Sequence, residues 1–182
     1  MTRPIALALC LAAIAGGAFA AETSVSRPPS NVDFAGFASL TRTVAEYRRD
    51  RLVGLEDFQA MGTKRGTLIL DARSADAYAR GHIAGAVNLP FTDFTAESLA
   101  RVIGDPNRRI LIYCNNNFAN DVEPVRMKAS VVALNIQTFV NLYGYGYRNV
   151  YELADKVDLT DPAVAWVSQA NPTKSMAFIP QP

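Results

Sequence analysis

The residue with the clearest potential for chemistry is a cysteine, Cys114. Cys114 follows four apolar, strand-favouring residues at 110–113, and three asparagines come directly after it. A short apolar run of this kind is typical of a buried strand. In an open parallel α/β sheet, ligands bind at the carboxyl ends of the strands, where the following helices direct their free backbone N–H groups. The pattern therefore predicts a reactive thiol at a ligand-binding edge.

Residues 1–20 have the pattern of a secretory signal peptide. A short basic start at Arg3 precedes an apolar run rich in Ala and Gly, and Ala18-Phe19-Ala20 is a small-x-small cleavage site. The alternative is a membrane anchor, but the run is shorter than the ~20 residues that span a bilayer. We therefore expect cleavage after Ala20 and a periplasmic or secreted protein without a membrane segment.

Export would leave Cys114 as the only thiol, because Cys10 is lost with the signal peptide. A single thiol in an oxidising compartment is either a reactive group or a buried small hydrophobe. One of the 18 basic side chains, Arg3, is also lost, so 17 basic side chains stand against 17 acidic ones. This balance does not indicate a nucleic-acid partner. One histidine and one remaining cysteine do not make a zinc site, and we expect neither a metal nor another cofactor.

Short apolar runs alternate with helical patterns along the rest of the chain. Residues 21–31 are expected to be a flexible leader, and apolar residues at three- and four-residue steps predict a helix over 32–51. The expected domain, 52–153, has strands near 52–55, 67–71, 86–89, 110–113 and 149–153, and helices near 56–61, 74–80, 95–103 and 131–144. This alternation predicts an α/β fold, with a parallel sheet of about five strands and helices on both faces. Residues 154–182 are expected to be a loosely packed tail with one helical turn near 163–167.

Three segments resemble rhodanese-like domains. The first runs from Leu70-Asp71-Ala72-Arg73 to Gly81-His82-Ile83-Ala84-Gly85-Ala86-Val87-Asn88, and it is similar to the family's Asp-x-Arg strand end and Gly-His-Ile-x-Gly-Ala-x-Asn segment. Residues 110–114 are similar to the strand that delivers the family's catalytic cysteine, and residues 146–153 to its closing turn and last strand. The resemblance extends over about 52–153 and implies the rhodanese-like fold.

The resemblance also implies sulfurtransferase chemistry, in which a thiolate takes the outer sulfur of thiosulfate or a persulfide donor and passes it to a thiol or similar acceptor. An ordinary thiol has a pKa of about 8.5, and a loop of backbone N–H groups would lower this pKa and hold an anionic donor. Cys114 is the predicted catalytic residue. The expected partner is a small sulfur-containing anion or thiol, with a protein partner as a second expectation. The predicted substrate-binding residues are Asn115, Asn116, Asn117, Phe118, Ala119 and Asn120.

The segment after Cys114 departs from the family's pattern. It has no glycine and no arginine before Arg126, and it is longer than the usual segment by roughly fifteen residues. Asparagine tolerates left-handed backbone geometry, so the run still predicts a curled cradle, although one without a nearby cation for a dianionic donor. The inserted stretch from Asp121 to Lys128 is a candidate lid or source of the missing charge.

Three further residues are expected to support the site without taking part in the chemistry. Asp71 and Arg73, at a strand end, are expected to pair with groups of the adjacent loops, and His82 to be a hydrogen-bonded structural histidine. A cysteine phosphatase or arsenate reductase would need an arginine where Asn120 stands, which makes this alternative a poor match. A non-catalytic rhodanese-homology module that binds a partner protein or a small sulfur compound remains open. Thiol reactivity distinguishes such a module from an enzyme.

Overall fold

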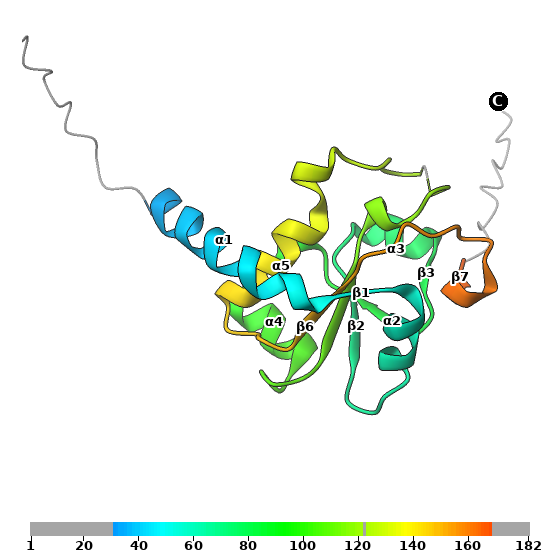
Figure 1. Ribbon diagram of the computed structural model, residues 1–182, viewed down its shortest axis with the longest axis horizontal. Helices are drawn as coiled ribbons and strands as arrows, with labels where there is room; N and C mark the ends of the chain where they lie inside the picture. The colour runs from blue at the N-terminus through cyan, green and yellow to red at the C-terminus, as the bar shows by residue number, and fades with distance from the viewer. Residues whose placement is uncertain (1–30, 122, 169–182) are drawn as a thin grey trace, which may run out of the picture. The chain divides into compact units, whose positions relative to one another are not determined.

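The computed structural model describes residues 31–121 and 123–168 (Figure 1). The predicted signal peptide, nearly all of the predicted leader and the last part of the predicted tail therefore lie outside the described residues. The chain divides after Asp33 into two units, and the helices and strands described below belong to the second. Among the described residues, no helix is both long enough and apolar enough to cross a bilayer.

A five-stranded sheet lies at the centre of this unit, with the strand order β1-β6-β5-β2-β4. Its strands are β1 Leu52–Val53, β2 Leu68–Asp71, β4 Ala86–Asn88, β5 Ile110–Tyr113 and β6 Val150–Leu153. All pairings between these strands are parallel. The four residues of β5 and the four of β2 are all buried, because a central parallel strand is covered on both faces. All of them except Asp71 are apolar or aromatic. The predicted α/β fold is confirmed.

Helices cover both faces of the sheet, as Figure 1 shows. One face packs against α1 Phe34–Arg48, α4 Ala96–Ile103 and α5 Leu134–Gly144. The other face packs against α2 Leu55–Gly62 and the chain after β6, with α3 Ala75–Arg80 beside it. Because successive strand side chains point to opposite faces, Ile110 and Ile112 enter the first core whereas Leu111 and Tyr113 enter the second.

Two predicted helix starts are confirmed, and both have capping side chains. Ser74 accepts a hydrogen bond from the backbone N–H of Ala77 at the start of α3, and Thr95 accepts one from Ser98 at the start of α4. These side chains satisfy N–H groups that have no partner within the helix. The α4 helix ends at Gly104, whose φ of +76° suits glycine.

The long helix predicted from Val131 begins at Leu134 instead. Residues Ser130–Val132 form a separate 3-10 turn, and Ala133 has a ψ of 140° that interrupts the helical backbone. Val131 matches the apolar spacing of the helix, yet it is 81% exposed whereas Phe139 is buried. The backbone of Ala133 thus sets where α5 begins.

The described start of the predicted tail, residues 154–168, is largely exposed but is joined to the domain at defined positions, which loose packing did not predict. Val157 and Val164 are buried, and β7 Trp166–Val167 pairs antiparallel with β3 His82–Ile83. The expected helical turn is a 3-10 turn at Pro162–Val164. Two-residue strands are too short to produce a recognisable alternation, so the sequence did not show this pairing.

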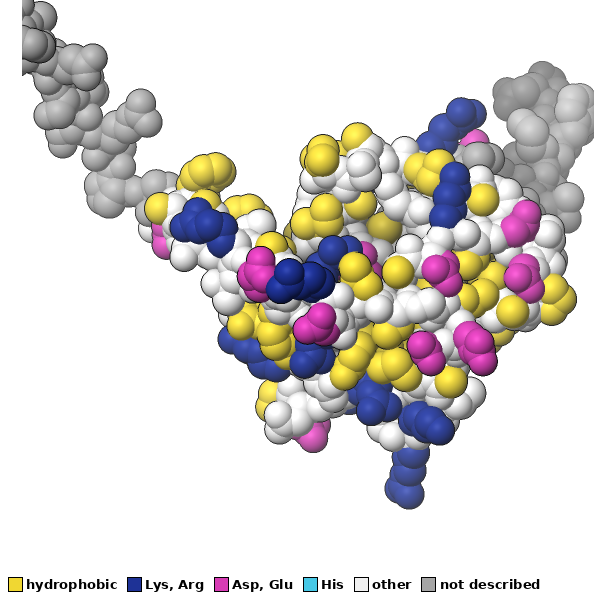
Figure 2. All heavy atoms as spheres, viewed as in Figure 1, with side chains coloured by type: hydrophobic (Ala, Val, Ile, Leu, Met, Phe, Trp, Pro, Cys, Tyr) yellow, Lys and Arg dark blue, Asp and Glu magenta, His cyan; other side chains and the backbone are white. Residues whose placement is uncertain are grey.

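Basic and acidic side chains are mixed over the face of the molecule in view in Figure 2. Asp76 and Arg80 form an exposed ion pair one turn apart on α3. Exposed pairs of this kind contribute little to stability, commonly about 0.3–0.5 kcal/mol. The cores on the two faces of the sheet therefore account for more of the stability than these surface pairs.

We predict that Phe139→Ala lowers the free energy of unfolding by about 3–5 kcal/mol, because it leaves a cavity in the core under α5. The matched variant is Val131→Ser, which belongs to the same apolar pattern but is exposed. It should change stability by no more than about 0.5 kcal/mol. Urea unfolding of both variants measures the difference, and equal losses would contradict the observed start of α5.

Candidate active site

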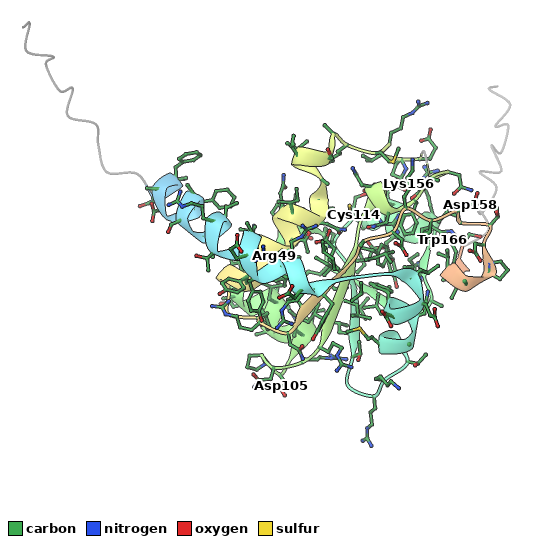
Figure 3. All side chains as sticks on the ribbon, viewed as in Figure 1. Arg49, Asp105, Cys114, Lys156, Asp158 and Trp166 are labelled. Atoms are coloured by element: carbon green, nitrogen blue, oxygen red, sulfur yellow. The ribbon has the colours of Figure 1, made fainter. Side chains whose placement is uncertain are left out.

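Cys114 lies directly after β5, at the carboxyl end of the central strand and in the interior of the domain (Figure 3). Its side chain is 0% exposed. Its backbone is extended, so its side chain follows the alternation of β5 and lies on the same face as Ile112. This is the face that α1, α4 and α5 cover.

One backbone N–H group donates to the thiol sulfur, that of Asn116 at 3.4 Å. The backbone N–H groups of Leu134 and Asn135, the first residues of α5, also favour the charged form of the thiol. The first N–H groups of a helix have no acceptor within it, and they carry the positive end of the helix dipole. A negative charge on Sγ would therefore be stabilised at this position.

Burial nevertheless raises the pKa of the Cys114 thiol above its ordinary value. Loss of hydration is the largest cause, and the carboxylate of Glu152 adds to it, while the backbone hydrogen bonds only partly oppose this rise in pKa. A buried acid without a compensating charge favours its neutral form. The expected lowering of the thiol pKa is therefore not found in this arrangement of the loop.

The three asparagines form a 3-10 turn, η3 Asn115–Asn117, instead of the expected curled cradle. The N–H of Asn117 donates to the carbonyl of Cys114, and the N–H of Phe118 donates to that of Asn115. These two N–H groups are used within the turn and do not face the sulfur. Of the N–H groups in this turn, the structure joins that of Asn116 to Sγ.

Asn117 connects four parts of the domain through its buried side chain. Its Oδ1 accepts hydrogen bonds from the N–H of Cys114 at 2.9 Å and from Nδ2 of Asn135 at 3.0 Å. Its Nδ2 donates to the carbonyls of Leu153 at 2.8 Å and Asp155 at 3.0 Å. The amide therefore ties the end of β5 to the end of β6, to the chain beyond β6 and to the start of α5.

The remaining residues of the predicted substrate-binding loop face the chain after β6. Phe118 is 0% exposed and contacts the rings of Tyr113 and Trp166 edge to face. The N–H of Ala119 donates to the carbonyl of Val157, and the Asn120 side chain binds Asp158 and Leu159. The structure therefore places Phe118, Ala119 and Asn120 with residues 157–166.

A cavity of about 380 Å³ lies beside the buried thiol. Its lining includes Asn115, which follows Cys114 in the chain, and the α5 residues Leu134, whose N–H acts on the thiol, and Gln137. The rest of the lining comes from the start of α3, the chain after β4 and the inserted segment: Ala72, Arg73, Ser74, Ala75, Ala77, Pro90, Phe91, Thr92, Asp93, Val125 and Lys128. Cys114 is outside this lining, so the cavity and Sγ are separated in this arrangement.

The described part of the inserted segment lies over the asparagine turn. Nδ2 of Asn115 donates to the carbonyl of Val125 at 3.0 Å. Asn116 exchanges two hydrogen bonds with the backbone of Lys128, at 2.7 and 3.0 Å. Val125 and Lys128 line the cavity, whereas Arg126 is exposed outside the lining. This is the location expected of a lid, and lid movement stays a prediction.

Asp71 and Arg73 form a buried ion pair at the end of β2. Arg73, 1% exposed, binds both carboxylate oxygens of Asp71, and it also donates to the carbonyl of Gly81 and to Asp121. The hydroxyl of Tyr113 donates to Asp71 at 2.6 Å. The pair thus joins β2 and β5 to the loops around them, which fits the expected supporting role.

His82 is the third residue expected to be structural. Its Nδ1 lies 2.9 Å from the carbonyl of Tyr78, and its ring stacks on that of Tyr78 with a centroid separation of 3.8 Å. Both contacts are within the α3–β3 segment, and His82 is outside the cavity lining. Among the described residues, no group of His, Cys, Asp and Glu side chains is arranged to hold a metal ion.

Two residues beside Cys114 were not predicted from the sequence. Asn135 contributes a backbone N–H to the thiol and its side chain to Asn117, and Glu152 is a buried carboxylate that acts on the thiol through its charge. A single acid inside the otherwise uncharged strand 150–153 is a signal that could have identified Glu152. The sequence carries no comparable signal for Asn135.

The raised pKa predicts that the Cys114 thiol ionises at a higher pH in the folded protein than in the unfolded chain. In the folded protein, the rate of Cys114 alkylation should have its pH midpoint above that of the same thiol in urea, because unfolding returns the thiol to water. Below both midpoints the thiol is neutral in either state. As pH rises from the unfolded to the folded midpoint, the contribution of the thiol to stability is lost. A folded midpoint at or below the unfolded one would contradict the burial described here.

The hydrogen bonds of Asn117 make a second prediction. Asn117→Ala should lower the free energy of unfolding by about 2–4 kcal/mol, because it leaves buried donors and acceptors without partners. Asn120→Ala is the control, because this exposed asparagine bonds only with exposed partners in the described chain. The control should cost about 1 kcal/mol or less. Equal losses in thermal or urea unfolding would show that Asn117 does not hold the loop.

Comparison with known proteins places this geometry in a family. Residues 55–155 match the Rhodanese-like domain. No curated protein matches the chain. Similar solved structures include a Rhodanese_3-like domain from Anabaena sp. (27% identity, 48% of this chain, 76% of that chain, TM-score 0.34) and a rhodanese with anions from E. coli (23%, 57%, 99%, 0.38). A thiosulfate sulfurtransferase from Pseudomonas aeruginosa is 24% identical over 65% of this chain and 20% of its own, with a TM-score of 0.45. On the family match over more than half its length, the chain belongs to the rhodanese-like domain family.

Proposed function

We propose that the protein is a rhodanese-type sulfurtransferase that carries sulfane sulfur as a persulfide on Cys114. The observation that supports this most is the position of Sγ at the end of β5, where the N–H of Asn116 donates to it and the first N–H groups of α5, those of Leu134 and Asn135, favour its charged form. Fixed donors around one sulfur stabilise negative charge there without reorganisation. A thiolate and a persulfide both carry that charge, so the same donors serve both stages of the reaction.

The proposed reaction has two displacements at sulfur. The Cys114 thiolate attacks the outer sulfur of thiosulfate, a new S–S bond forms, and the bond to the departing sulfite breaks with its electron pair. An acceptor thiolate then attacks the outer sulfur of the persulfide, and Cys114 leaves as a thiolate. Neither displacement consumes an external oxidant or reductant. The expected substrates are a small sulfur-containing anion or persulfide as donor and a thiol as acceptor.

Burial of Cys114 requires a movement before either displacement. The turn Asn115–Asn117 and the inserted segment separate Sγ from the cavity, and three hydrogen bonds join these two coverings. We infer that separation of Lys128 from Asn116 opens the way from the cavity to Sγ. Lys128 lines the cavity and Arg73 is held by two carboxylates. Lys128 is thus the lining cation, among the described residues, that is available to an anionic donor.

The cellular location is a proposal based on the sequence alone. The predicted signal peptide at residues 1–20 supports a periplasmic or secreted protein, in which Cys114 would be the only thiol. A sulfur carrier there would not lose its thiol to an intramolecular disulfide. The acceptor would then be a thiol outside the cytoplasm.

The full burial of Cys114 favours a second candidate function. A non-catalytic rhodanese-homology module could bind a small sulfur compound in the 380 Å³ cavity, or a partner protein, without forming a thiolate. Such a module needs neither lid movement nor thiol ionisation. Reactivity of Cys114 toward sulfur donors separates the two functions.

Intact-mass spectrometry tests the proposed function. We expect the protein to gain one sulfur atom on incubation with thiosulfate or with glutathione persulfide, and to lose it on addition of a thiol. Cys114→Ser should gain no sulfur, because it keeps the size of the side chain but lacks the nucleophile. Incubation up to pH 9 allows for the raised thiol pKa. No adduct from either donor would reject the sulfurtransferase and leave the binding module.

A further inference from the structure

Glu152 is a buried acid on the strand next to Cys114. It is 5% exposed, and it pairs in register with Ile112 of β5. Cys114 follows Ile112 by two residues in extended backbone, so its side chain lies on the same face of the sheet. Glu152 lies on this face too, because it follows Val150 by two residues in β6 and Val150 packs in the same core as Ile112. A carboxylate and the proposed nucleophile are therefore neighbours under α5.

Arg48 is the partner of this carboxylate. Its Nε and Nη2 each donate to one oxygen of Glu152, both at 2.5 Å. Arg48 is the last residue of α1 and lies outside residues 55–155, which match the family. The neighbouring Tyr47 fixes this end of the helix, because its hydroxyl donates to the carbonyl of Arg148 at 2.6 Å. The helix before the family match thus brings a partly exposed cation to the buried carboxylate of Glu152.

We propose that Arg48 is a positioning residue for the sulfur chemistry of Cys114, which acts by neutralising Glu152 so that negative charge can develop on Sγ. This inference rests on the proposed function, since it concerns the anionic thiolate and persulfide. Two like charges in a poorly hydrated site repel each other strongly. A bidentate arginine holds the opposite charge in a fixed geometry and reduces this repulsion.

Among the described residues around Cys114, Glu152 is the charged side chain that acts on the thiol. The residues of α5 and of the turn Asn115–Asn117 carry no charged side chain. Asp71 and Arg73 pair with each other and with Tyr113, which points into the opposite core. Lys128 meets the turn from outside, through Asn116. Glu152 is the charged side chain whose effect on the thiol pKa is resolved, and it raises that pKa.

The pH midpoint of Cys114 alkylation, measured in four variants, tests the proposal. Arg48→Met should raise the midpoint, and Glu152→Gln should lower it, each by about one pH unit. Near neutral pH, one unit is about a tenfold change in thiolate fraction. Arg48→Met with Glu152→Gln should return the midpoint toward wild type. The control is Arg49→Met, because Arg49, which directly follows α1 and is labelled in Figure 3, binds Glu46 on the surface. Its midpoint should not change.

The midpoint is expected to rise in Arg48→Met and to fall in Glu152→Gln, and these opposite directions exclude a merely structural role. Loosening of the domain would hydrate Cys114 and lower the midpoint in Arg48→Met as well as in Glu152→Gln. A midpoint in Arg48→Met that falls or does not move therefore overturns the proposal. If Arg48→Met does not fold by circular dichroism, an unchanged or higher midpoint in Glu152→Gln still overturns the proposal.

The measurement also separates this inference from the proposed function. Alkylation needs no sulfur donor, so the predicted shifts together with no persulfide by mass spectrometry would reject only the sulfurtransferase. A persulfide on Cys114 with midpoints that do not differ among the variants would reject only the role of Arg48.

Discussion

The hydrogen bonds of one buried amide hold the site together. Asn117 accepts the N–H of Cys114 and the side chain of Asn135, and donates to the carbonyls that follow β6. These bonds fix Sγ between the end of the central strand and the first turn of α5. They also hold the turn Asn115–Asn117 in place directly after Cys114.

Two opposing effects meet at the Cys114 sulfur. Burial and Glu152 favour the neutral thiol, whereas three backbone N–H groups favour the anion, and burial has the larger effect on the pKa. Arg48 limits the effect of Glu152 by binding both of its oxygens. Movement of the inserted segment would admit water to the thiol and reduce the main penalty. A closed, weakly ionised state and an open, reactive one are thus the two states that the proposed enzyme needs.

Much of the fold could be predicted because its signals are local. The apolar runs of β2 and β5 are continuous because both strands are buried on both faces, and Ser74 and Thr95 mark helix starts through hydrogen bonds within one turn. The start of α5 was placed too early because Val131 fits the helical spacing while the backbone of Ala133 breaks it. The β3–β7 pairing was missed because each strand has two residues and the partners are far apart in sequence.

The sequence by itself determined the rhodanese-like sheet, its order of strands and helices, and the place of Cys114 at a strand end, because these follow from apolar periodicity and short motifs. Only the tertiary structure decided what surrounds the sulfur. Glu152 and Arg48 are 104 residues apart in the chain, and Leu134 and Asn135 reach Cys114 from the far side of the inserted segment. Burial, charge and hydrogen bonding at the thiol are sums over such distant groups, so no local pattern could have shown that its pKa is raised.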